Sequence, residues 1–232
     1  NNTPAQYKKE FEWLKEVDSL ALANAQMNLQ TAYNNFFKRP EVGFPKFKSK
    51  KNHYYSYTTN NQGGNIYISD RYIKLPKIGL IRIKKHRDFE GLIKSVTVSK
   101  TPSGNHYVSV LVNQEEKEKL PVVDTQIGID LGIKEFAITS DGEMIENPKY
   151  LRKSEKKLRK LQKDLSRCQK GSKNREKCRI KVAKQHEKIA NQRKDFLNKL
   201  SHRLIMENQQ ICLEDLKVKN MMSNHKLAKS IA

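Results

Sequence analysis

The sequence contains few cysteines and no long apolar run, and each shortage excludes a class of protein. Its 3 cysteines among 232 residues are an odd number without the spacing of a disulfide framework, which favours a reducing cytoplasm. Cys168, Cys178 and His186 match no common zinc spacing, so we interpret them as ordinary helix residues rather than metal ligands. Since no apolar run approaches the length of a membrane span, no membrane partner is expected.

The sequence is also short of acidic residues, which leaves a large positive charge. It has 46 Lys and Arg residues against 25 Asp and Glu residues, so its formal net charge is +21. A charge of this size repels itself unless a polyanion neutralises it, and nucleic acid is therefore the expected partner. A basic membrane-surface protein is the alternative, but no amphipathic Lys-rich segment has a clean apolar face.

The first half of the chain predicts helices followed by short strands. Residues 4–38 have apolar residues at helical spacing with Asp18 as a candidate N-cap, and they form either one helix or a packed pair. A basic loop broken by Pro and Gly follows at residues 39–51, with Phe44 and Phe47 among its cations. Six short runs of period two then predict a small β-barrel. These runs are residues 55–58, 66–68, 73–75, 80–84, 93–99 and 106–113.

The second half predicts three strands and then a helix. Along residues 127–132 the apolar side chains alternate with Gly128, Asp130 and Gly132, so this segment is a strand with two different faces. Residues 136–139 and 144–145 are the next strands, joined by a hairpin turn with Asp-Gly at its centre. The pair at 147–148, Asn followed by Pro, predicts a helix start with Asn as N-cap and Pro at the first helical position.

Residues 149–203 carry most of the positive charge. They contain 21 Lys or Arg residues and 5 acidic residues, a net +16. Apolar residues recur every three or four positions on both sides of a Gly-Ser break at 171–172, which predicts a long antiparallel helical hairpin. Its wide cationic surface is either solvated or lies along a nucleic-acid backbone. The second helix ends near Asn208, and residues 210–216 form a short strand that ends in Glu214 and Asp215.

Asp130 and Glu214 are the candidate catalytic and metal-binding residues. Three hairpin-connected strands, a helical excursion and a fourth strand are typical of an RNase H-like layout, in which the fourth strand lies parallel to the first. The two carboxylates then lie on adjacent strands and repel each other unless a divalent cation such as Mg²⁺ binds them, and paired ions can hydrolyse a phosphodiester bond. Gly128 and Gly132 would leave room for a backbone or a phosphate. The alternative is that Asp130 is a turn residue and Glu214 a strand-end charge, and Asp215 faces the opposite side of the strand.

Several segments occur together in one order along the chain. They are residues 43–50 (GFPKFKSK), 127–134 (IGIDLGIK) and 140–142 (SDG), the basic helical pair, and residues 213–216 (LEDL) and 224–231 (NHKLAKSI). In this order they resemble the TnpB family, transposon-encoded RNA-guided nucleases related to type V CRISPR effectors. The resemblance extends over nearly the whole chain.

The resemblance implies a multidomain α+β protein. Residues 1–40 would belong to a helical recognition lobe, residues 41–120 to a wedge β-barrel, and residues 121–232 to an RNase H-like (RuvC) nuclease domain that is incomplete at its C-terminus. Asp130 and Glu214 would be the first two catalytic carboxylates, both binding Mg²⁺. The implied partners are a guide RNA and a target DNA beside a short recognised motif, in a prokaryotic cytoplasm at the nucleoid. A third aspartate and a four-cysteine zinc site would follow Ala232, so the chain is expected to be part of a longer protein.

Two other functions stay open. The same scaffold without chemistry would be a nuclease-inactive, RNA-guided DNA-binding repressor. A transposase that joins DNA directly would need a paired-histidine metal motif, which His202 and His225 do not provide. The expected nucleic-acid contacts are cations of the basic loop, the strands and the hairpin: Lys46, Lys48, Lys50, Lys51, Arg82, Lys84, Lys85, Arg87, Arg152, Lys156, Arg159, Lys160, Lys163, Arg167, Lys173 and Arg175.

Overall fold

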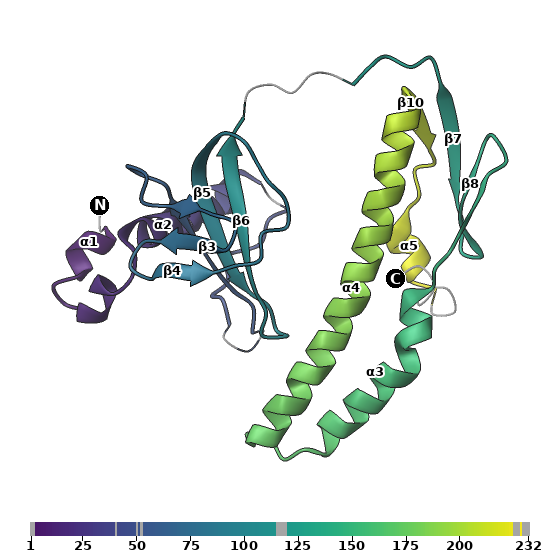
Figure 1. Cartoon of the computed structure of the whole chain (residues 1–232). Coiled ribbons are helices and arrows are strands. Elements are labelled where there is room, and N and C mark those ends of the chain that lie inside the picture. Colours follow the sequence, from purple (N-terminus) through teal and green to yellow (C-terminus); the bar gives the residue numbers. More distant parts are fainter. Residues whose placement is uncertain are drawn as a thin grey trace. The chain divides into compact units, whose positions relative to one another are not determined.

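The computed structural model describes residues 3–39, 41–49, 51, 53–114, 120–224 and 228. The chain divides into two compact units, Asn1–Lys117 and Glu118–Ala232 (Figure 1). Within the described ranges, no helix is both long enough and apolar enough to cross a bilayer. The assignment of these units to a recognition lobe, a wedge domain and a nuclease domain stays a prediction.

The first unit begins with helical segments, and the longest of them is capped as predicted. Asp18 accepts hydrogen bonds from the backbone N–H groups of Leu20 (3.4 Å) and Ala21 (3.2 Å) and from the hydroxyl of Thr59. The last contact ties the start of this helix to the sheet that follows it. The region predicted as one helix or a pair is therefore two short helical turns and one long helix. These segments are α1 (Pro4–Tyr7), the 3₁₀ turn η1 (Glu12–Lys15) and α2 (Ser19–Lys38).

The six predicted strands of the first unit are all present, in two antiparallel sheets. One sheet has the order β1-β5-β6 and the other the order β2-β3-β4. Alternating apolar residues specify them because successive side chains of a strand point to opposite faces. The strands are β1 (Tyr55–Asn60), β2 (Tyr67–Ile68), β3 (Tyr72–Leu75), β4 (Gly79–Arg82), β5 (Leu92–Lys100) and β6 (His106–Asn113).

The predicted β-barrel is not confirmed, because no barrel closes among the described strands. The two sheets instead share one apolar core, in which Ile73 of β3 and Val96 of β5 are both 0% exposed. Period-two alternation is the same in a barrel strand and in a strand of two packed sheets, so the pattern does not separate the two architectures.

The second unit is a four-stranded sheet with a long helical crossover (Figure 1). Its strand order is β10-β7-β8-β9, with β10 parallel to β7 and the other neighbours antiparallel. This is the order and direction predicted from the sequence, because a parallel neighbour needs a long connection and the helices supply it. The elements are β7 (Gln126–Leu131), β8 (Glu135–Thr139), β9 (Met144–Glu146), α3 (Tyr150–Arg167), α4 (Lys173–Glu207), β10 (Gln210–Leu213) and α5 (Val218–Met222).

The helix α4 covers one face of this sheet. Ile127 and Ile129 of β7 are buried in one cluster with Leu204 of α4. Phe136 of β8 meets Phe196 of α4 edge-on, with ring centroids 5.0 Å apart. Because side chains alternate along a strand, Gly128 and Asp130 point away from this apolar cluster. The polar candidate residues therefore lie on the face of the sheet that α4 leaves uncovered.

The start of α3 differs from the prediction. Asn147 is not the N-cap: its side-chain oxygen accepts from the N–H of Lys149 at 3.0 Å, and its amide donates to the carbonyl of Ile133 at 3.1 Å. Lys149 is left-handed, with φ of 47°, and the helix begins at Tyr150. The Asn-Pro pair therefore forms a turn anchored to the preceding hairpin, and the helix begins two residues later than predicted.

Candidate functional site

Asp130 and Glu214 are brought to neighbouring positions by the register of β7 and β10. The last paired residues of the two strands are Ile129 and Leu213, and the two acids are the next residue along each strand. In a parallel pair about 4.8 Å apart, residues at matching positions point to the same face. The two carboxylates therefore share a face, and Asp215 follows on the other side.

The two acids line one open hollow in the surface of the second unit. The hollow has a volume of about 380 Å³. Both acidic side chains are exposed. The structure thus brings the two predicted site residues together and leaves Asp215 outside the lining. The lining residues are Gly128, Ile129, Asp130, Ile138, Thr139, Ser140 and Glu214.

The charge of Asp130 is not compensated inside the described chain. In those residues, neither Asp130 nor Glu214 takes part in an ion pair, and no group of three His, Cys, Asp or Glu side chains is placed to hold a metal ion. An exposed carboxylate needs no buried partner because water solvates it. The sequence pattern suggested a carboxylate inside an apolar strand, whereas the structure has it at the open face of that strand. Two oxygen ligands are available here, which is an incomplete set for a divalent cation.

The glycines beside Asp130 have different roles. A Cβ at Gly132 would lie 2.9 Å from the carbonyl oxygen of Glu135, so this glycine accommodates the protein's own turn rather than a ligand. A Cβ at Gly128 would lie 3.6 Å from the Cβ of Ser140, an ordinary contact distance. Only Gly128 is therefore placed to keep the hollow open.

Ser140 is a residue of this hollow that the sequence did not single out. Its N–H donates to the carbonyl of Gly128 at 2.8 Å, and its hydroxyl accepts from the N–H of Gly128 at 3.1 Å. These bonds extend the β7–β8 ladder one residue beyond Thr139, where β8 ends. The turn that follows is held to α4 by an ion pair of 2.8 Å between Glu143 and Arg203, which raises the pKa of Arg203 mainly through this hydrogen bond. The sequence could have indicated this residue, because the pairing register of the hairpin places Ser140 opposite Gly128.

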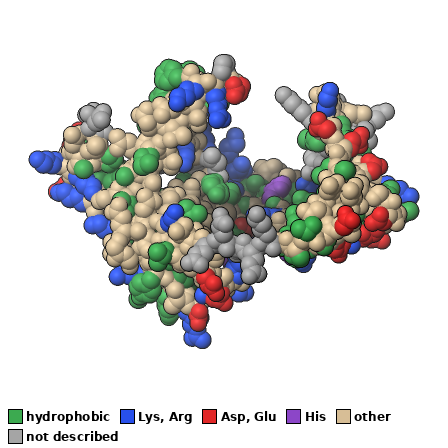
Figure 2. All heavy atoms as spheres, turned by 90° about the horizontal axis from the view of Figure 1, so that it is seen from above, with side chains coloured by type: hydrophobic (Ala, Val, Ile, Leu, Met, Phe, Trp, Pro, Cys, Tyr) green, Lys and Arg blue, Asp and Glu red, His purple; other side chains and the backbone are tan. Residues whose placement is uncertain are grey.

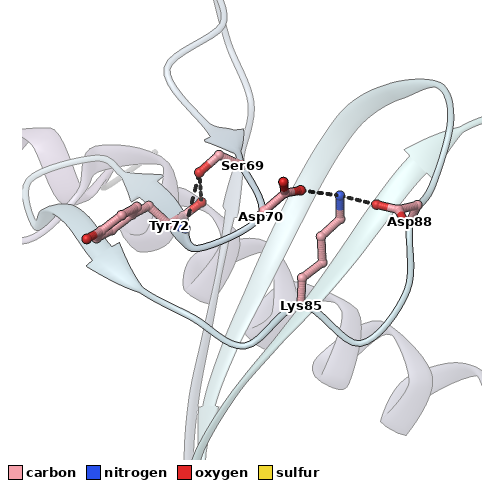
Figure 3. Close-up of polar contacts among 5 residues, drawn as sticks. All are labelled: Ser69, Asp70, Tyr72, Lys85 and Asp88. Carbon is pink, nitrogen blue, oxygen red and sulfur yellow. Dashed lines mark hydrogen bonds and ion pairs between the residues drawn. The ribbon is translucent and has the colours of Figure 1, made fainter.

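Three of the predicted nucleic-acid contacts have partners within the chain. Lys85 lies between Asp70 (3.7 Å) and Asp88 (Figure 3), and its hydrogen bond with Asp88 is the main cause of its raised pKa. Arg159 pairs with Glu155 at 3.0 Å. The guanidinium of Arg175 donates to two backbone carbonyls at the end of α3. These three side chains therefore already make ion pairs or hydrogen bonds within the protein.

The remaining predicted cations are exposed wherever the structure describes them. In the view of Figure 2, Lys and Arg side chains lie at many separate places on the surface rather than in one patch. Lys50 lies outside the described residues. The exposed members are Lys46, Lys48, Lys51, Arg82, Lys84, Arg87, Arg152, Lys156, Lys160, Lys163, Arg167 and Lys173.

Comparison with known proteins gives one family and two similar curated proteins. The family model OrfB_IS605, described as "Probable transposase", matches residues 109–225, which include all four strands of the β10-β7-β8-β9 sheet. A protein of Escherichia coli (strain K12) named "Putative RNA-guided DNA endonuclease InsQ" is 35% identical over 213 residues, which are 91% of this chain and 52% of that protein. A Streptomyces pristinaespiralis protein named "Putative RNA-guided DNA endonuclease" is 38% identical over 229 residues, 97% of this chain and 56% of that protein. The chain therefore spans about half the length of these relatives.

Proposed function

Because the chain belongs to the OrfB_IS605 family, we propose that it is part of a transposon-associated, RNA-guided DNA endonuclease with a RuvC-type site at Asp130 and Glu214. The names of the two similar proteins support this activity, because both contain the words RNA-guided DNA endonuclease. The observation that carries the proposal is the hollow shared by Asp130 and Glu214, two acids separated by 84 positions in the sequence. The partners would be a guide RNA and the DNA that it matches.

The donor atoms at this hollow fit Mg²⁺ in kind. Both are carboxylate oxygens, exposed to solvent and without a cation of the protein beside them among the described residues. Mg²⁺ prefers oxygen ligands and keeps several waters, so two carboxylates can hold it only with further ligands. When bound, the ion would activate water and neutralise charge on the phosphate. A third acidic ligand from outside this set is therefore part of the proposal.

The side chains around the two acids would admit and orient a nucleic-acid backbone. Gly128 leaves space beside Asp130, and the hydroxyl of Ser140 lies at the same hollow. Asp130 is held in place because its backbone pairs with Ile138 of β8. The exposed cations outside the hollow would neutralise phosphates and supply affinity without sequence preference.

Cleavage assays on substituted proteins test the site. In the protein extended to the full length of its relatives and loaded with guide RNA, Asp130→Ala and Glu214→Ala should each lower the rate of DNA cleavage by more than about 100-fold, because each removes a metal ligand. RNA binding should be unchanged. Asp215→Ala is the matched control and should keep its cleavage rate. Unchanged cutting by the two site variants, or a loss confined to Asp215→Ala, would refute the assignment.

A nuclease-inactive, RNA-guided DNA-binding repressor is the second candidate. The exposed cations would serve RNA-guided DNA binding equally well without cleavage, whereas the presence of both Asp130 and Glu214 argues against an inactive site. The repressor would bind matched DNA as tightly as the nuclease but would give no product at any Mg²⁺ concentration. Binding and cleavage measured on the same preparation distinguish the two. Product that appears only with Mg²⁺ excludes the repressor.

A further inference from the structure

Two thiols meet at the turn between α3 and α4. The sulfur atoms of Cys168 and Cys178 are 3.5 Å apart, and the thiol of Cys168 also lies 3.2 Å from the carbonyl oxygen of Asp164, a second acceptor for its one proton. Cys168 is the C-cap of α3, and Cys178 lies in the second turn of α4. Both side chains are half-buried, whereas Cys212, the third cysteine, is exposed. The fold thus brings two of the three thiols within reach of each other.

The contacts that hold this turn do not depend on the thiols. The guanidinium of Arg175 donates to the carbonyl of Leu165 at 2.9 Å and to that of Cys168 at 3.3 Å. The hydroxyl of Ser172 accepts from the N–H of Arg175 at 3.1 Å and caps α4. The end of one helix and the start of the next are therefore clamped together. A disulfide needs its sulfurs about 2.05 Å apart, so closing the gap takes a movement of roughly 1.5 Å.

We propose that Cys168 and Cys178 form a reversible disulfide and are an oxidation site of this protein. The oxidant is a low-molecular-weight disulfide of the glutathione class. The thiolate of Cys178 attacks one oxidant sulfur, which breaks the oxidant's S–S bond and releases one thiol. The sulfur of Cys168 then attacks the mixed disulfide, loses its proton and releases the second thiol. The protein gains one S–S bond and loses two hydrogens, and the oxidant becomes two thiols.

The contact between the thiols affects which of them attacks the oxidant first. It raises the pKa of Cys168, because the proton of that thiol is shared with the sulfur of Cys178. A raised pKa leaves less of Cys168 as thiolate and so disfavours it as the first attacking group. A thiophilic metal site is the competing interpretation. His186, the third ligand considered from the sequence, is exposed two turns further along α4, and the described part of the chain contains no three-ligand group.

The disulfide would lock the α3–α4 turn. It would link the C-cap of α3 to α4 across a connection that contains Lys170 in the loop and Lys173 at the start of α4. A cross-link of this kind stabilises mainly by reducing the freedom of the unfolded chain. The proposal does not depend on the nuclease function, because it concerns only the hairpin.

Thiol mapping of the chain under graded oxidised and reduced glutathione tests the proposal. Oxidation should protect Cys168 and Cys178 from alkylation together, and a non-reducing digest should yield one peptide pair joined through them. Cys212 should stay alkylatable or carry only glutathione. The melting temperature should rise by several °C, and trypsin cleavage at Lys170 and Lys173 should slow at least tenfold. Dithiothreitol should reverse both changes.

Single substitutions supply the controls. Cys168→Ser should stop the reaction at a stable glutathione adduct on Cys178, with no rise in melting temperature. Cys212→Ser should behave as the parent protein. The proposal is overturned if all three thiols stay alkylatable, if only Cys212 reacts, or if the pair is found holding zinc. A disulfide that forms equally well in urea would also refute it, because the folded turn would then play no part.

Discussion

The glycines on either side of Asp130 should respond to alanine in opposite ways. At Gly132 the new Cβ would lie 2.9 Å from the carbonyl oxygen of Glu135, a separation that real Cβ atoms essentially never show. The clashing atom belongs to the backbone, so no rotamer change relieves it. The N–H of Gly132 also donates to the carbonyl of Phe136 at 3.2 Å, and this bond closes the turn between β7 and β8. The substitution must therefore displace the turn itself.

The size of the effect follows from these contacts. Forcing an extra methyl group into a packed position typically costs about 1–3 kcal/mol, so Gly132→Ala should lower the free energy of unfolding by that amount. At Gly128 the nearest atom would be 3.6 Å away and the strand conformation suits alanine. Gly128→Ala should therefore change the free energy of unfolding by less than about 0.5 kcal/mol, or stabilise slightly by restricting the unfolded chain.

Urea unfolding of the two variants, followed by circular dichroism, measures the difference. Hydrogen exchange at the amides of β7 and β8 assigns any loss to the correct sheet. Under the proposed function, Gly128→Ala should also slow DNA cleavage, because its methyl group enters the hollow beside Asp130 while the fold is kept. Equal stability of Gly132→Ala and the parent protein would refute the steric argument. So would a larger loss at Gly128 than at Gly132.

Three further predictions concern single contacts. Asp18→Ala should lower the free energy of unfolding by about 1–2 kcal/mol, because α2 loses its cap and its tie to the sheet; thermal melting measures this loss. Arg175→Met should loosen the end of α3, seen as faster hydrogen exchange in the hairpin, whereas an unchanged exchange rate would contradict its clamping role. Lys85→Met should reduce stability at neutral pH. The pKa of Lys85 is raised by its hydrogen bond with Asp88. The contribution of this ion pair to stability is therefore complete below the ordinary lysine pKa and is lost as the pH rises through the raised pKa. The difference between Lys85→Met and the parent protein should therefore shrink as the pH rises past the ordinary lysine pKa.

For the proposed complex with RNA, the exposed cations predict how the affinity depends on salt concentration. RNA affinity should fall steeply between low and moderate salt, because each neutralised phosphate releases counterions. Lys160→Gln on the exposed surface of α3 should reduce that dependence, whereas Arg175→Lys should leave it nearly unchanged, since Arg175 is committed to two carbonyls. Affinity that does not vary with salt would contradict an electrostatic interface.

Strand positions were predictable from the sequence, whereas the way the sheets close was not. Period-two alternation located β1 to β6, because it depends only on which side chains are buried within each strand. Closure depends on hydrogen bonds between strand edges, about which alternation says nothing. The same limit applies to single residues. The cap at Asp18 was predicted correctly because capping involves only neighbouring residues. The N-cap predicted at Asn147 was wrong, because its side chain also donates to the carbonyl of Ile133 in the preceding hairpin, and this contact is not local.

The candidate site was predictable to the extent that topology determines it. A long crossover after three antiparallel strands requires a parallel fourth strand, and this placed Asp130 and Glu214 on neighbouring strands. The sequence did not show which basic side chains contact other groups of the protein. Arg175 and Lys85 are basic residues of the kind that bind phosphates. Arg175 instead donates to the carbonyl of Leu165, and Lys85 pairs with Asp70, and neither partner is a near neighbour in the sequence. A charge pattern locates the cations but does not show which of them are already paired with other groups of the protein.

The choice between Glu214 and Asp215 depends on register, and the structure shows what sets it. A slip of one residue moves every side chain of a strand to the other face, so a shifted β10 would present Asp215 beside Asp130. The end of α4 is tied to the residue before β7, because the hydroxyl of Thr125 donates to the carbonyl of Glu207 at 2.7 Å. The carbonyl of Thr125 accepts from the N–H groups of Gln209 at 3.0 Å and of Gln210, the first residue of β10, at 3.2 Å. These bonds fix where β10 begins. Within the four residues of β10, the partly buried Ile211 packs against the apolar cluster of the sheet, so a one-residue slip would also remove this side chain from the core. The position of the second acid is thus determined away from the hollow, by the joint between α4 and β7 at the far end of the strand and by the core contact of Ile211.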